Sequence, residues 1–166
     1  MAMKKTLITL LLLTVPGTLI HADELQTTTD RAASDYLNNR FGVGLMVGEP
    51  TGLSLKYWMT QSWAVDGGVG ASFHRSDGLQ LHSDALWHWF GLIDSSHGLW
   101  APYVGGGVRY KFEDGDDAFG FRVPVGISYM LDHHPIDVFV EVAPILDVTP
   151  SVRGSFNFAA GARFWF

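Results

Sequence analysis

The sequence contains no cysteine and few charged residues of either sign. The absence of cysteine excludes a disulfide framework, a thiolate metal site and a cysteine nucleophile. Charged residues make up 17% of the chain, whereas about 25% is usual in a soluble domain. The formal net charge of −6 excludes a nucleic-acid-binding protein, which would carry a basic patch.

Residues 1–22 have the pattern of a cleavable export signal. Two lysines, Lys4 and Lys5, precede an apolar stretch from residue 7 to residue 15, and the predicted cleavage site follows Ala22. The apolar stretch is about half the roughly 20 residues that a membrane-spanning helix needs. Loss of the two lysines changes the formal net charge from −6 to −8. We therefore expect the protein to be exported from the cytoplasm.

Residues 23–40 differ in composition from the rest of the chain. Three consecutive threonines lead to Asp30, which could cap one short helix. No wide apolar face follows, so the composition favours a solvated periplasmic linker.

From Phe41 to the end, apolar and polar residues alternate with a period of two. In one segment, Val65 and Val69 fall on one side while Asp66 and Gly68 fall on the other. Residues 41–166 leave about 16 residues for each of eight strands with its connection, which suits strands of about 9 to 11 residues. The predicted strands cover residues 41–48, 52–59, 62–74, 79–89, 103–112, 119–131, 136–145 and 155–166.

The polar face of these strands is poorly suited to a soluble exterior. It consists largely of Gly, Ser and His with sparse ions of both signs, whereas a soluble surface is densely charged. We therefore assign the polar face to the interior and the apolar face to lipid, where only a closed barrel satisfies every backbone group. The sequence predicts an all-β fold, an eight-stranded antiparallel up-and-down transmembrane β-barrel.

A periplasmic N-terminus would place the outward-facing aromatic residues in two belts, as membrane interfaces require. The predicted periplasmic belt contains Phe41, Tyr57, Trp63, Trp89, Tyr129, Phe164 and Phe166, and the outer belt contains Phe73, Phe112, Phe119 and Phe156. This distribution supports an outer-membrane location with both termini in the periplasm.

Two segments resemble known bacterial outer-membrane barrels. The last six residues, Gly161 to Phe166, resemble the terminal signal that the barrel assembly machinery reads, carried here by Gly161, Phe164 and Phe166, although Ala159 replaces the usual preceding polar residue. Residues 48–58, with the sequence GEPTGLSLKYW, resemble the first hairpin of a family of small, largely uncharacterised outer-membrane barrels. The resemblance covers residues 41–166. It implies the eight-stranded architecture of the OmpA transmembrane domain and OmpX, and it assigns no catalytic residues to this sequence.

The inward positions carry charges of both signs in similar number. Hairpin registers counted from the turns predict that Asp84 lies near Arg109 and that Asp137 lies near Arg163. The charges can therefore compensate each other as a structural ion network. A gated pore is the alternative, but side chains just fill an eight-stranded barrel. The predicted network consists of Lys56, Asp66, Asp84, Arg109, Lys111, Arg122, Asp137, Glu141 and Arg163.

Histidines in two segments raise the question of catalysis. His82, Ser83 and Asp84 are consecutive, and strand geometry turns Ser83 to the opposite face, so they cannot form a catalytic triad. His74 and Ser76 share a face near the predicted outer rim, and lipid A deacylase barrels use such a pair with an acidic partner. No acidic partner is identifiable from the sequence.

Three connections offer further candidates. His133 and His134 are adjacent in a predicted turn. Solvent exposure is a simpler interpretation than metal binding, because one metal ion would need further ligands. The acidic loop from Glu113 to Asp117 lacks the ligand spacing of a calcium-binding loop. A solvated turn is therefore favoured over a loop that shares divalent cations with the phosphates of lipopolysaccharide. The longest connection is predicted over residues 91–101, on the periplasmic side.

The sequence therefore predicts a non-enzymatic outer-membrane barrel with a structural or interaction role in the envelope. We expect a monomer that contacts outer-membrane lipid, lipopolysaccharide and the barrel assembly machinery, without nucleic acid, metal or cofactor. The alternatives are a lipid A-modifying enzyme of the deacylase type and a small gated channel.

Overall fold

The computed structural model describes residues 39–72, 78–93, 95, 98–113 and 117–166. The predicted export signal, most of the predicted linker, and the pair His74 and Ser76 lie outside these residues. No helix in the described part of the chain is long and apolar enough to cross a membrane. The strands are β1 (Phe41–Gly48), β2 (Thr51–Trp58), β3 (Trp63–Ser72), β4 (Gly78–His88), β5 (Gly98–Glu113), β6 (Ala118–Arg122), β7 (Val125–Leu131), β8 (Ile136–Thr149) and β9 (Arg153–Trp165).

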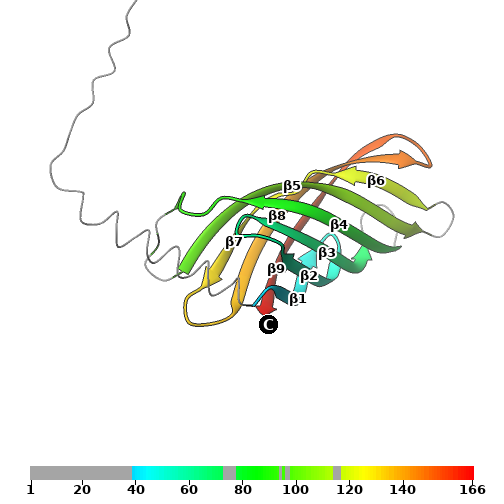
Figure 1. Cartoon of the computed structure of the whole chain (residues 1–166). Coiled ribbons are helices and arrows are strands. Elements are labelled where there is room, and N and C mark those ends of the chain that lie inside the picture. Colours follow the sequence, from blue (N-terminus) through cyan, green and yellow to red (C-terminus); the bar gives the residue numbers. More distant parts are fainter. Residues whose placement is uncertain (1–38, 73–77, 94, 96–97, 114–116) are drawn as a thin grey trace, which may run out of the picture.

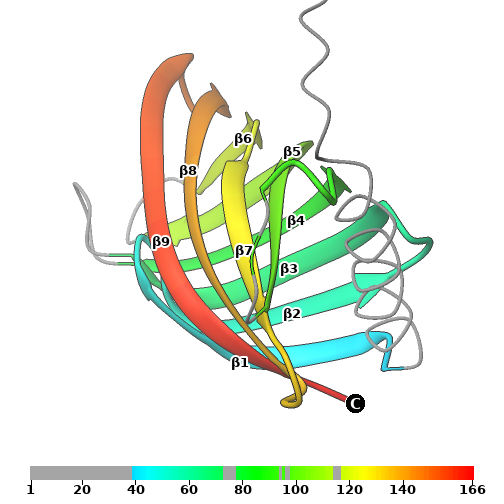
Figure 2. The same ribbon diagram turned by 90° about the vertical axis from the view of Figure 1, so that its left-hand side faces the viewer.

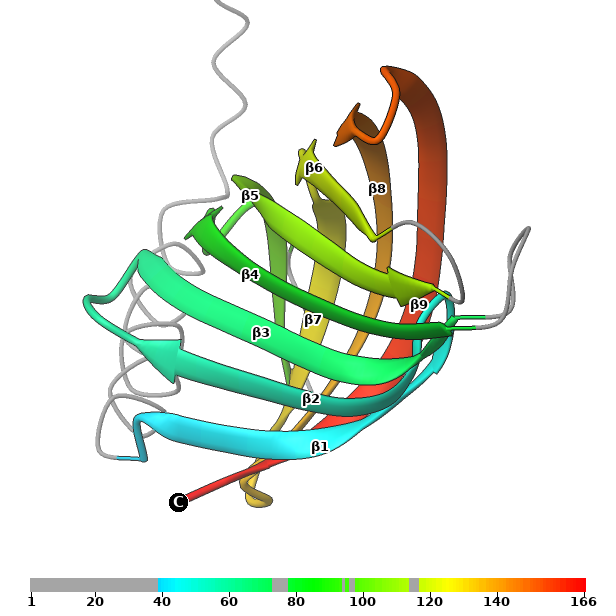
Figure 3. The same cartoon turned by 90° about the vertical axis from the view of Figure 1, so that its right-hand side faces the viewer.

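The strands form a closed antiparallel ring around a common axis (Figures 1 and 2). Consecutive strands from β1 to β5 pair with one another, and β8 pairs with β9. The ring closes where β9 pairs with β1 over seven residue pairs, from Gly42↔Trp165 to Gly48↔Ala159. Figure 3 shows β1 to β5 along one wall of this ring.

Segments β6 and β7 are two parts of one barrel strand. Both lie between β5 and β8, and the alternation of buried and exposed residues continues through Val123 and Pro124. Pro124 has no N–H to donate to the ladder, but its carbonyl accepts from Gly105 at 2.8 Å, and Val123 N–H donates to Pro144 O at 3.0 Å. The barrel therefore has the predicted eight strands.

Two predicted strand boundaries were wrong. Strand β5 begins at Gly98, so the predicted connection over residues 91–101 is too long; Trp100 belongs to the strand and stands opposite Tyr129 on β7. Pro102 hid the strand in the sequence, because a proline argues against the interior of a strand. Strand β8 extends to Thr149, four residues beyond the predicted end.

The two faces of the barrel differ sharply in composition. The exterior exposes large apolar side chains along every long strand, including Leu45 at 66%, Leu53 at 47% and Val140 at 46% exposure. The interior holds buried polar and charged groups, together with an apolar cluster at one end. The cluster consists of Trp58, Ala64, Leu99, Ala101, Met130 and Trp165.

Outward-facing aromatic rings gather near both ends of the barrel. At the end with the C-terminus, Trp63 contacts Trp87 with ring centroids 5.0 Å apart, and Phe164 contacts Phe166 at 5.0 Å. Near the other end, Phe112 contacts the ring of Tyr110 at 4.7 Å. Phe73, predicted for the second belt, lies outside the described residues. Which end faces the periplasm stays a prediction.

Candidate functional site

The interior of the barrel is the candidate site, because the ionisable groups converge there. All nine charged residues predicted for the interior are buried, with side chains from seven of the eight barrel strands. Asp147, which was not predicted, is also buried at 8% exposure. It follows Asp137 and Glu141 at even intervals on β8, so continuing the alternation beyond the predicted strand end would have identified it.

Arg163 on β9 is the most highly connected group in the interior. Its guanidinium donates to both carboxylate oxygens of Asp137, at 3.2 and 3.1 Å. It also lies 3.7 Å from Asp66 and 4.0 Å from the centroid of the Phe139 ring. The two partners Asp137 and Arg163 are opposite each other in the β8–β9 register, as predicted.

A second guanidinium, that of Arg122 on β6, contacts two strands that are not paired with each other. It lies 3.3 Å from a carboxylate oxygen of Asp84 on β4 and donates to Glu141 on β8. Tyr103 also donates its hydroxyl to Glu141, at 3.0 Å. Arg122 and Arg163 thus serve four buried carboxylates.

The predicted pairing of Asp84 with Arg109 was wrong. The β4–β5 register places Asp84 opposite Gly107 and places Arg109 opposite His82. The Arg109 guanidinium instead reaches across to Asp147 on β8 and contacts both carboxylate oxygens at 2.6 Å. An arginine side chain is long enough to bridge non-neighbouring strands of a narrow barrel, and hairpin counting does not detect such contacts.

Lys56 occupies an aromatic environment near the end that carries the C-terminus. Its Nζ lies 2.7 Å from His88 Nε2, and 5.0 and 5.1 Å from the ring centroids of Trp58 and Tyr103. Trp58 also stacks on Trp165 with ring centroids 6.0 Å apart. These bulky side chains fill that end of the barrel.

The structure separates the residues of the apparent catalytic triad. Ser83 is exposed on the exterior, while Asp84 is buried in the interior with His82 beside it. Ser83 therefore lies on the opposite face of β4 from His82 and Asp84, as predicted. His74 and Ser76 cannot be placed, because residues 73–77 lie outside the described part of the chain.

The predicted turn candidates lie at the ends of strands. His133 and His134 are both exposed in the β7–β8 turn, and His133 has a φ of 66°. At the ends of the acidic loop, Glu113 pairs with Lys111 at 3.0 Å, and Asp117 accepts the Tyr110 hydroxyl at 2.7 Å.

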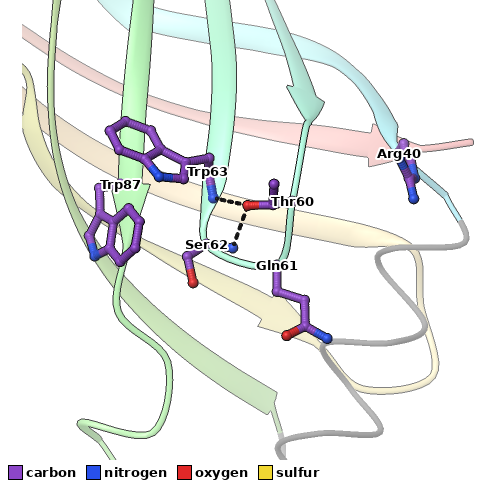
Figure 4. Close-up of a pocket in the computed structure, with 6 residues that line it drawn as sticks. All are labelled: Arg40, Thr60, Gln61, Ser62, Trp63 and Trp87. Atoms are coloured by element: carbon purple, nitrogen blue, oxygen red, sulfur yellow. Dashed lines mark hydrogen bonds between the residues drawn. The ribbon is translucent and has the colours of Figure 1, made fainter.

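One surface pocket opens beside the β2–β3 turn (Figure 4). Thr60 Oγ1 organises this turn by accepting from the backbone N–H groups of Ser62 and Trp63, at 3.3 and 3.0 Å. Figure 4 shows Arg40 on the far side of the pocket from the tryptophans. The pocket is lined by Arg40, Thr60, Gln61, Ser62, Trp63 and Trp87.

The barrel is similar to the crystal structure of the N-terminal β-barrel domain of Pseudomonas aeruginosa OprF. The two share 15% sequence identity, with a TM-score of 0.62, over 77% of this chain and 98% of that domain. At this identity the similarity concerns the fold. No model of a known protein family and no curated protein matches the sequence.

Proposed function

We propose that the protein is an integral outer-membrane barrel with a structural or interaction role in the cell envelope and without catalytic activity. The observation that carries this proposal is the inverted distribution of its side chains. Apolar residues cover the outside of a closed ring, and ion pairs fill the inside.

A lipid environment explains this distribution better than water does. The exposed residues of β8 include Val138, Val140 and Val142 in unbroken alternation, at 42%, 46% and 41% exposure. Exposed patches of this extent are rare on soluble monomers and mark contact with a membrane or a partner. Because the ring is closed, each of the strands β1 to β9 is paired on both sides, as lipid requires.

The C-terminal strand supports insertion by the barrel assembly machinery. Phe164 and Phe166 expose 45% and 64% of their surface on the exterior, and the Phe166 N–H donates to Phe41 O at 2.9 Å. Gly161 lies at the β1–β9 seam, where the Phe139 ring occupies the space of a side chain. We propose that these features form the assembly signal and that both termini are periplasmic.

The same exterior defines the proposed partners. Outer-membrane phospholipid and the acyl chains of lipopolysaccharide would cover the apolar band, with aromatic rings at its edges. The chain would act as a monomer, since lipid alone satisfies this surface.

Heat-modifiability combined with fractionation tests the proposal. We expect the protein in the outer-membrane fraction, with different electrophoretic mobility before and after boiling because a closed barrel resists detergent at room temperature. Recovery in the soluble periplasmic fraction without a mobility shift would refute membrane insertion.

A further inference from the structure

Three potential metal ligands meet on the interior wall formed by β3 and β4. Asp66 and Asp84 stand opposite each other in the β3–β4 register, and His82 lies two residues before Asp84 on the same face. One ligand atom from each residue lies within 4.8 Å of the other two. The ion pairs described above do not account for this arrangement, because they contain no histidine.

Four of the six side-chain polar atoms of this cluster are buried without hydrogen bonds. Asp66 Oδ1, both carboxylate oxygens of Asp84 and His82 Nδ1 have no hydrogen-bond partner within the described residues. Asp66 is 7% exposed and Asp84 is 2% exposed. Buried polar atoms normally have a partner, and a bound cation would supply one for these acceptor atoms.

The local charges also favour a bound cation. Among the described residues, Asp66 forms an ion pair with Arg163 at 3.7 Å and Asp84 forms one with Arg122 at 3.3 Å, and Lys56 stands opposite Asp66 in the β2–β3 register. Both guanidiniums make closer contacts with the other two acids, Asp137 and Glu141. Two like charges directly opposite on neighbouring strands repel each other, and a cation between them would remove that repulsion.

Gly68 makes room for the His82 ring on this wall. The imidazole ring lies over Gly68, where a Cβ atom would be 2.9 Å from Nε2 and closer still to Cε1. His82 is partly exposed, whereas Gln80 and Asp84 on either side of it are buried.

We propose that Asp66, His82 and Asp84 bind one divalent transition-metal ion, with Zn²⁺ as the preferred ion. An imidazole and two carboxylates suit Zn²⁺, whereas Mg²⁺ and Ca²⁺ prefer oxygen ligands. Bonds of about 2.0 to 2.2 Å require small side-chain rotations toward the ion. The site lies inside the barrel and is independent of the proposed membrane location.

Titration calorimetry of Zn²⁺ into the purified, folded, untagged protein in detergent tests the proposal. The protein is first treated with a chelator, and folding of each variant is verified by the mobility shift on boiling. The test variants are His82→Gln and Asp66→Asn. The matched control is the double variant His133→Gln/His134→Gln, which removes the exposed histidine pair of the β7–β8 turn.

We expect one Zn²⁺ per wild-type chain, affinity at least about tenfold weaker in both test variants, and unchanged affinity in the control. X-ray absorption of the wild-type complex should show a single imidazole with oxygen ligands, a measurement that does not depend on the variants folding. The proposal is overturned if wild-type protein does not bind Zn²⁺. Unchanged affinity in the test variants, or loss of binding only in the turn variant, would equally overturn it.

Discussion

Replacing Arg163 with methionine should strongly destabilise the barrel. The substitution keeps a long side chain beside Phe139 but removes the guanidinium that contacts both oxygens of Asp137. Asp137 is 0% exposed, so its charge would remain in the interior without its principal partner. Breaking a buried pair in this way costs about 3 to 5 kcal/mol.

Reversible urea unfolding in lipid vesicles measures the effect. With a urea slope of about 1 to 3 kcal/mol per molar, the unfolding midpoint should fall by at least about 1 M. Trp165 donates its indole N–H to Asp137 at 3.2 Å, so tryptophan fluorescence is sensitive to local change. Unfolding should therefore also be followed by the fraction of protein that migrates as the folded form on gels.

Two variants separate loss of charge balance from loss of packing. Adding Asp137→Asn to Arg163→Met removes the unpaired charge and should restore much of the stability. Arg153→Met on the same strand replaces an exposed arginine and should leave the midpoint unchanged. If Arg163→Met matches wild type, or if the double variant is no more stable than Arg163→Met alone, the electrostatic reasoning is wrong.

Further predictions concern the interior, the exterior, the seam and conduction. Arg109→Met should also lower the urea midpoint, but less than Arg163→Met does, because the partner of Arg109, Asp147, is 8% exposed and nearer a strand end. A decrease in the midpoint equal to or larger than that of Arg163→Met would contradict this prediction. Val140→Arg should destabilise the vesicle-bound barrel by about 2 to 4 kcal/mol if β8 faces lipid. The control Val152→Arg changes a residue that is 74% exposed between β8 and β9, and it should have little effect on stability. If the barrel tolerates both substitutions equally, its exterior faces water. Gly44→Val should abolish the electrophoretic band of the folded, unboiled protein, because its Cβ would collide with the backbone of Ala162 and Arg163 at the β1–β9 seam. Gly106→Ala should retain this band, because the space around Gly106 is open. Purified protein should be silent in planar bilayers because ion pairs and aromatic rings fill the interior, and discrete conductance steps would show otherwise.

The faces of the strands could be predicted because alternation is a local property. Each inward charge follows from its position relative to neighbours two residues away, so Lys56 and Arg122 could be assigned without knowing any partner. The eight-strand count followed in the same way, despite Pro124. The predicted strand ends were less accurate where proline or a long hairpin hid the period, and Asp147 was missed for that reason.

Contacts across the interior could not be predicted from the sequence. Asp137 and Arg163 are hairpin neighbours, so register alone brings them together. Arg109 and Asp147 lie on strands that are not paired with each other, and their contact depends on the width of the ring and on side-chain length. The cluster of Asp66 with His82 and Asp84 likewise depends on the β3–β4 register, which the composition of the intervening turn does not fix.

The position of Arg163 on the last barrel strand couples completion of the ring to neutralisation of its interior. Through this one residue β9 supplies a cation to Asp137 on β8 and to Asp66 on β3, and contacts Ser54 on β2 at 3.5 Å. Before β9 arrives, those carboxylates lack that cation and the seam with β1 is open. An unfinished barrel is thus disfavoured twice, by an unpaired strand edge and by excess negative charge. Strand β9 therefore supplies the closing backbone hydrogen bonds and a buried positive charge together.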